Sequence, residues 1–162
     1  MKPHQLYECV NTVATNVKYK KAAPLQIAKS DEGICKGQAI VWCRNMLDGI
    51  APEQTKPSYQ RAAALQVIYE QHGNVEVFRN ASMVPTSIEG DAYTLFWHIT
   101  DKPGVYQIRV KGHALAAANQ NGKFYFFNAD DGLFEYDSAR DLYGKMLERP
   151  RVYCEMWRLV GS

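Results

Sequence analysis

The hydrophobic and polar positions along the chain predict helices in its first half and strands in its second half. From Cys35 to Leu47, apolar residues recur every three or four positions, as on the buried face of a helix. The residues on that face are Cys35, Ala39, Trp42, Cys43 and Met46. The polar residues expected to face solvent are Lys36, Arg44 and Asn45.

A second helix is predicted from about 59 to 72, where alanine, leucine and glutamine are frequent and Gly73-Asn74 follows as a stop signal. The pattern then changes to a period of two. We expect a short strand at Val75–Phe78, and either a strand or a short helix at Tyr93–Ile99. Residues 5 to 17 alternate loosely and fit either a strand or a helix.

The last third of the chain predicts an antiparallel sheet. Residues 105–110 alternate, and residues 113–120 and 123–128 flank Asn121-Gly122, the strongest short signal for a two-residue hairpin turn. A polar helix at 138–148 and a final strand at 152–160 complete the pattern. Early helices followed by a late antiparallel sheet indicate an α+β fold, with N-terminal helices packed on a C-terminal sheet.

The predicted hairpin places a histidine close to two polar side chains. If Asn121-Gly122 is the whole turn, counting outward sets Leu115 opposite Asn128 and His113 opposite Asp130. Opposed residues and residues two apart share a sheet face. We therefore expect the imidazole of His113 to reach Asn128 or Asp130, while Asp131 points to the other face.

Cys35 begins the first predicted helix, two residues after the end of the polar run 29–33. The partial positive charge of a helix N-terminus favours the thiolate, which is the reactive form of cysteine. A cysteine nucleophile, a histidine that carries the proton and an amide or carboxylate that orients the histidine occur in this order in papain-like cysteine proteases. We predict Cys35 as the nucleophile, His113 as the base, and Asn128 or Asp130 as the orienting residue.

The sequence also offers candidates for the oxyanion donors and for an alternative base. The backbone N–H of Cys35 would be one oxyanion donor, and Gln26 or Ser30 in the preceding loop would supply the second. His98 is the alternative base if His113 fails. The thiols of Cys43 and Cys154 lie in apolar patterns, which predicts that both are buried.

Composition predicts one ordinary globular domain over residues 1–162, with 46% hydrophobic and 22% charged residues. A formal net charge of +2 is too small to indicate nucleic-acid binding. No apolar run has the length of a membrane span, and Met1–Gln5 is not followed by the apolar core of a Sec-type signal peptide. The cysteines and histidines have no zinc-site spacing, so we expect neither a metal nor another cofactor.

Three sequence blocks resemble the YopT-like cysteine proteases, which are bacterial effectors with a papain-like core. The blocks are Gly33-Ile34-Cys35 with Trp42, Gly112-His113-Ala114-Leu115-Ala116, and the run Phe127 to Phe134. The family pattern in the last block is similar to Phe-Asp-Pro-Asn-x-Gly-x-Phe. The resemblance implies that Cys35 is the nucleophile, that His113 is the base, and that Asn128 stands at the position of the family's catalytic aspartate.

The resemblance implies a papain-like protease that hydrolyses peptide bonds in a protein of a host or competitor and that leaves the cell by a non-Sec route. Without export, the protein would act in the cytoplasm. The same thiol chemistry also fits a deamidase, a transglutaminase, an acyltransferase or a peptidoglycan amidase, because a thioester does not dictate which nucleophile resolves it. A non-enzymatic binding module with this fold is the third alternative.

Overall fold

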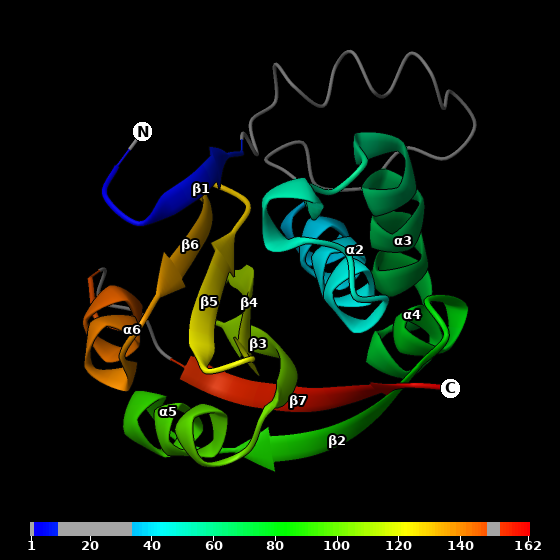
Figure 1. Ribbon diagram of the computed structural model, residues 1–162. Coiled ribbons are helices and arrows are strands. Elements are labelled where there is room, and N and C mark those ends of the chain that lie inside the picture. Colours follow the sequence, from blue (N-terminus) through cyan, green and yellow to red (C-terminus); the bar gives the residue numbers. More distant parts are fainter. Residues whose placement is uncertain (1, 10–33, 149–152) are drawn as a thin grey trace.

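A seven-stranded antiparallel sheet runs through the molecule, in the order β1-β6-β5-β4-β3-β7-β2 (Figure 1). The computed structural model describes residues 2–9, 34–148 and 153–162. The strands are β1 (Gln5–Glu8), β2 (Met83–Glu89), β3 (Gly104–Val110), β4 (His113–Gln120), β5 (Lys123–Asn128), β6 (Gly132–Tyr136) and β7 (Tyr153–Gly161). The helices are α2 (Cys35–Leu47), η1 (Pro52–Gln54), α3 (Tyr59–His72), α4 (Asn74–Asn80), α5 (Ala92–Asp101) and α6 (Ala139–Met146).

Helices cover both faces of this sheet. On one face α2, α3 and α4 form a core with alternate residues of β4, namely Ala114, Ala116 and Ala118. On the other face α5 and α6 pack against Leu115 and Ala117 of the same strand (Figure 1). Because β4 is buried on both faces, most of its sequence is a continuous run of apolar residues. Its alanines on the α2 face leave room for the helix to lie directly on the sheet.

The two early helices and the hairpin have the predicted bounds. The side chain of Ser58 accepts the backbone N–H of Arg61 and begins α3, and Gly73 ends it with a φ of +87°. The hairpin pairs Gln120 with Lys123 and Leu115 with Asn128, as counted from the sequence. Both turn residues have positive φ, as the two-residue turn requires.

The prediction of a strand at Val75–Phe78 is wrong, because these residues belong to helix α4. Val77 and Phe78 are both buried, whereas Val75 is 66% exposed, which fits a helix and not the alternation of a strand. Four residues are too few to distinguish the two periods. The open assignment of Tyr93–Ile99 is settled as helix α5.

The prediction of a sheet formed only by the C-terminal part of the chain is wrong. Its two edges are β1, near the N-terminus, and β2, in the middle of the chain. Within the predicted alternating stretch 5–17, Gln5–Glu8 is a strand, and residues 10–17 lie outside the described part. Strand β6 was also not predicted. Strand β1 has only four residues, and the strands that β1 and β2 pair with lie far away in the sequence.

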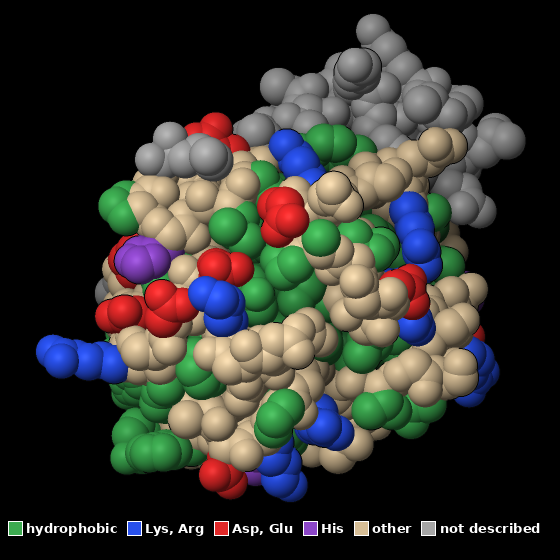
Figure 2. All heavy atoms as spheres, viewed as in Figure 1, with side chains coloured by type: hydrophobic (Ala, Val, Ile, Leu, Met, Phe, Trp, Pro, Cys, Tyr) green, Lys and Arg blue, Asp and Glu red, His purple; other side chains and the backbone are tan. Residues whose placement is uncertain are grey.

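Charges of both signs are interspersed on the face shown in Figure 2. In the described part of the chain, no helix has the length and apolar character that crossing a bilayer requires.

Candidate active site

Cys35 is the first residue of α2, and it is half-buried. The residue before the helix, Ile34, provides no side-chain cap, and the first turn contains no acidic residue. An acidic cap would compete with the thiolate for the positive end of the helix dipole. The start of α2 therefore leaves that favourable position to the sulfur of Cys35.

The first turn of α2 is held against α3 by an unusually close contact. A Cβ on Gly37 would lie 1.8 Å from the carbonyl oxygen of Ala62, so only glycine allows this approach. The side-chain oxygen of Gln66 accepts the backbone N–H of Gly37 at 2.9 Å. That N–H is one of the donors that a helix start leaves without an intrahelical partner. Both contacts fix the helix start two residues away from Cys35.

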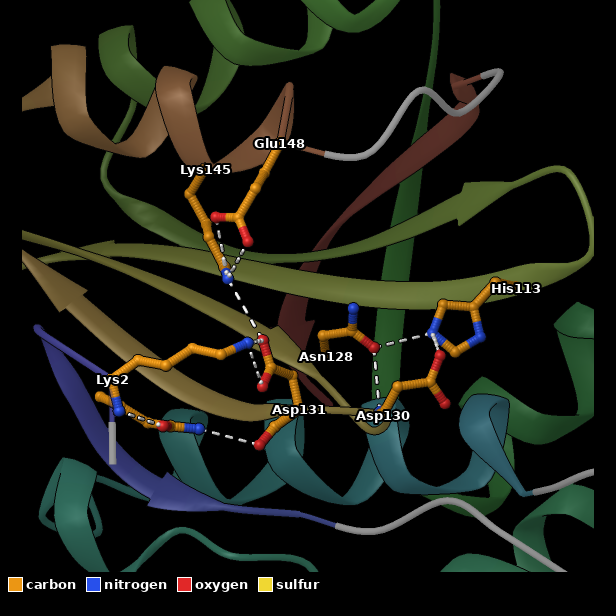
Figure 3. A network of polar contacts seen from close by, with 8 residues as sticks. Lys2, His113, Asn128, Asp130, Asp131, Lys145 and Glu148 are labelled. Atoms are coloured by element: carbon orange, nitrogen blue, oxygen red, sulfur yellow. Dashed lines mark hydrogen bonds and ion pairs between the residues drawn. The ribbon is translucent and has the colours of Figure 1, made fainter.

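His113 and Asn128 meet at the open end of the hairpin. His113 is the first residue of β4, Asn128 is the last of β5, and Nε2 of His113 lies 2.8 Å from Oδ1 of Asn128 (Figure 3). The histidine side chain is 8% exposed and Asn128 is 7% exposed. The structure thus brings these two predicted site residues together in a largely water-excluded position.

Asp130 also reaches the histidine, although it is not in the strand. The ladder between β4 and β5 ends at Leu115 and Asn128, so the predicted pairing of His113 with Asp130 does not form as a strand pair. Instead, a turn closed by the N–H of Asp131 and the carbonyl of Asn128 brings Oδ2 of Asp130 to 3.4 Å from Nε2 of His113. Asp130 is more exposed than Asn128 and lies beside the ring (Figure 3).

The hydrogen bonds of Asn128 determine which ring nitrogen of His113 carries the proton. The backbone N–H of Asp130 donates to Oδ1 of Asn128 at 3.0 Å, which identifies that atom as the oxygen. The oxygen can only accept, so Nε2 of His113 must donate to it. In the neutral ring Nδ1 is then the unprotonated nitrogen, and it is the one left to accept the thiol proton of Cys35.

Cys35 and His113 each favour the ionised form of the other. Burial opposes ionisation of the thiol, but a hydrogen bond and the charge of His113, with a backbone hydrogen bond at Ala114, lower the pKa of Cys35. Burial likewise opposes the imidazolium, but Cys35, Asn128 and Asp130 together raise the pKa of His113. The two pKa values are drawn toward each other, which favours a thiolate–imidazolium pair.

The pKa values of two other thiols are raised, whereas that of Cys35 is lowered. Burial raises the pKa of Cys9 to about 12 and that of Cys43 still further. Cys43 is fully buried, as predicted, and the side chain of Cys154 is outside the described part.

His98, the alternative base, lies on α5 across the sheet from Cys35. Gln26 and Ser30, the predicted second oxyanion donors, also lie outside the described residues.

A charged network holds the turn that follows Asn128, and sequence reasoning missed it. Lys2 Nζ lies 3.0 Å from both carboxylate oxygens of Asp131, and Lys145 Nζ lies 3.3 Å from one of them (Figure 3). Gln5 donates to the backbone carbonyl of Asp131 at 2.9 Å. The prediction that Asp131 points away from His113 is confirmed. Its partners come from both ends of the chain, so no local pattern could indicate them.

We expect Asp131→Asn to lower the free energy of unfolding by about 1–2 kcal/mol at pH 7. Burial opposes ionisation of Asp131, but hydrogen bonds from Lys2 and Lys145 outweigh it and hold the pKa of the carboxyl below 3.8. A group with a lowered folded pKa stabilises the protein above its unfolded pKa and loses that contribution as the pH falls. Urea unfolding of both proteins at pH 7 and pH 3 tests this. A difference that does not shrink at pH 3 would contradict it.

Among the described residues, no group of three or more histidine, cysteine, aspartate or glutamate side chains could hold a metal ion.

Comparison with known proteins adds the fold to this picture. No protein-family model and no curated protein matches the chain. Among solved structures, the crystal structure of the Pseudomonas avirulence protein AvrPphB matches with a TM-score of 0.51 and 17% identity. The match covers 80% of this chain and 92% of that chain. AvrPphB is an effector of the YopT-like cysteine protease family with a papain-like fold. The predicted α+β, papain-like fold is therefore confirmed.

Proposed function

We propose that this protein is a cysteine peptidase in which Cys35, His113 and Asn128 form the catalytic triad. The observation that carries the proposal is the constellation itself. The thiol of Cys35, at a helix start, lies within reach of the charge of His113, which lowers its pKa. Nε2 of the same ring lies 2.8 Å from a buried amide oxygen. The papain-like fold supports the same assignment but does not by itself determine an activity.

The residues can carry out peptide hydrolysis in two stages. Nδ1 of His113 takes the thiol proton, and the thiolate of Cys35 attacks the carbonyl carbon of the scissile bond. The backbone N–H of Cys35 is one donor to the developing oxyanion. The imidazolium then gives its proton to the leaving amine as the C–N bond breaks, which leaves a thioester on Cys35. His113 next deprotonates a water molecule that attacks the thioester, and the acid product leaves with the thiol restored.

Asn128 and Asp130 have different tasks in this mechanism. Asn128 keeps the Nε2 proton in place and thereby presents Nδ1 to the sulfur. Asp130 contributes negative charge beside the ring, which favours the imidazolium. The hydrogen bond to Asn128 is shorter and more deeply buried, so we assign the orienting role to Asn128.

Alkylation of the intact protein tests whether Cys35 is the activated thiol. With limiting iodoacetamide at pH 6, we expect Cys35 to be modified at least about 100-fold faster than Cys9 and Cys43, because only its thiolate is stabilised. Mass spectrometry of tryptic peptides measures each site separately. Equal modification of the three thiols would contradict an activated site.

The division of roles between Asn128 and Asp130 predicts unequal effects of replacing them. Asn128→Ala is expected to slow alkylation of Cys35 at pH 6 by about tenfold and to leave the neutral His113 ring as a mixture of tautomers. Asp130→Asn should slow alkylation by less than about threefold and keep the Nε2–H tautomer, because its contact is more exposed. The ring tautomer is measured by ¹⁵N NMR. If Asp130→Asn slowed alkylation of Cys35 more than Asn128→Ala does, the orienting role would belong to Asp130.

We further propose that the substrate is a protein of another cell and that the peptidase reaches it by a non-Sec route. The support is the sequence resemblance to effector proteases and the fold shared with an avirulence protein. Production in a eukaryotic cytosol and in a bacterial periplasm distinguishes the targets. Toxicity confined to the eukaryotic cytosol and lost in Cys35→Ala supports a host protein. Toxicity only in the periplasm would indicate peptidoglycan instead.

A further inference from the structure

The residue after the proposed nucleophile is a buried lysine. The sequence pattern predicted that Lys36 faces solvent, and that prediction is wrong, because the residue is only 3% exposed. Helix α2 packs against α3 and the sheet, and the side chain of Lys36 also reaches a ring of α4, so even a polar position of its first turn is covered. A lysine can occupy such a position only if its ammonium finds partners there.

Three aromatic rings and one amide surround that ammonium. Nζ of Lys36 lies 4.4 Å from the ring centre of Trp157, 5.0 Å from that of Tyr69 and 5.1 Å from that of Phe78. These distances are typical of cation–π contacts. Nζ also donates to Oε1 of Gln107 at 2.5 Å. The rings come from β7, α3 and α4, so the cage joins three elements around the first turn of α2.

Gln107 continues this contact to the strand that carries the proposed base. Its side chain is fully buried in β3, and its Nε2 donates to the carbonyl of Leu115 on β4 at 3.3 Å and to that of Ile108 at 2.7 Å. Leu115 is two residues from His113. A buried polar bridge therefore connects the residue beside Cys35 to the strand that positions His113.

Lys36 directly follows Cys35 in the first turn of α2, so a charge on one side chain acts on the other. No carboxylate among the described residues forms an ion pair with Lys36. Burial lowers the pKa of Lys36 to about 7, even though negative charge on Cys43 and on Cys35 acts to raise it. The other ionisable groups that act on it are Glu155 on β7 and Arg109 on β3. Coupling between two sites is reciprocal, so a charged Lys36 must favour the thiolate of Cys35 by the same free energy.

We propose that Lys36 is a positioning residue for the reaction: its caged ammonium stabilises the Cys35 thiolate from inside the protein, and its bridge through Gln107 fixes the helix start relative to β4. This inference rests on the proposed function, because it assigns Lys36 a role in preparing the same nucleophile. It adds a second, buried cation to the site.

The test is the pH dependence of Cys35 alkylation by iodoacetamide in three variants. Lys36→Met keeps an unbranched apolar chain and removes the charge, and we expect it to move the midpoint of thiolate formation up by about one pH unit. Gln107→Leu keeps the charge and removes the bridge, so its midpoint should move by less than half as much. Lys102→Met, an exposed lysine at the end of α5, is the matched control and should leave the midpoint unchanged.

A second measurement does not depend on the folding of Lys36→Met. The titration of Lys36 is followed by NMR of its ¹³Cε resonance in wild type and in Cys35→Ala. Loss of the thiolate should lower the titration midpoint of Lys36 by the same amount by which Lys36→Met raises that of Cys35. Equal lysine midpoints in the two proteins, or an unmoved Cys35 midpoint in a folded Lys36→Met, would overturn the proposal.

The two proposals fail in different ways. The proposed peptidase site would be overturned if the wild-type Cys35 formed its thiolate at the pH of an ordinary thiol and His113→Ala did not change that pH. A low midpoint that depends on His113 and not on Lys36 would overturn only the role of the lysine.

Discussion

Replacing His113 with alanine is expected to slow alkylation of Cys35 at pH 6 by about 100-fold, because burial then raises the pKa of the thiol unopposed by the imidazole, and the thiol is almost fully protonated at that pH. The hydrogen bond and the charge of His113 are the contributions that overcome burial of the sulfur. The same change removes the group that protonates the leaving amine. Peptide hydrolysis should therefore fall further than alkylation, by about 10⁴-fold.

The pH dependence of alkylation separates this effect from damage to the fold. The difference in alkylation rate between wild type and His113→Ala should shrink steadily above pH 8. It should disappear near pH 10, where any accessible thiol is ionised. His98→Ala is the control, because that histidine lies across the sheet on α5 and should leave Cys35 unaffected at every pH. A loss in His113→Ala that is equally large at pH 10 would indicate a displaced or covered thiol instead of a lost charge partner.

Gly37→Ala is expected to lower the free energy of unfolding by about 3 kcal/mol, because the new methyl group would lie 1.8 Å from the carbonyl oxygen of Ala62. That oxygen belongs to the backbone of α3 and cannot turn aside, so the two helices must separate. In a chain of this length the expected fall in melting temperature is roughly 6–12 °C. Separation would also break the hydrogen bond from Gly37 to Gln66 and shift Cys35, so alkylation at pH 6 should slow as well.

Gly144→Ala is the matched control for this substitution. Gly144 is also in a helix, α6, but it is exposed and has no atom within 4 Å of an added Cβ. Alanine there should raise the free energy of unfolding by about 0.5–1 kcal/mol, because glycine is a poor helix former. Melting curves of the two variants decide the matter. A stabilised Gly37→Ala would show that α2 and α3 are not in close contact at this point.

The sequence was sufficient for the parts of the site that depend on local signals. The thiol at the start of α2 follows from helical spacing after a polar run. The neighbourhood of His113 and Asn128 follows from the Asn121-Gly122 turn, since a two-residue hairpin fixes the register of both strands. Counting alone could not separate Asn128 from Asp130. Their difference depends on where the ladder ends and on a turn hydrogen bond, neither of which has a sequence pattern.

Features that depend on tertiary contacts were not predictable. A lysine is usually exposed, so the sequence places Lys36 on the surface, and only the packing of α2 between α3 and the sheet reverses this. The salt bridge between Lys2 and Asp131 joins residues 129 positions apart. Strands β1 and β2 are recognisable only through their partners, β6 and β7. In each case the determining interaction lies outside any window of local sequence.

The most direct test of the triad is hydrolysis of denatured casein in H₂¹⁸O, followed by mass spectrometry of the products. Peptide-bond hydrolysis through a thioester on Cys35 predicts new peptides whose C-terminal carboxylates carry ¹⁸O in the wild type, and none in Cys35→Ala. Equal cleavage by Cys35→Ala would contradict the account. So would ¹⁸O in glutamine or asparagine side chains with every peptide bond intact, which would identify a deamidase instead.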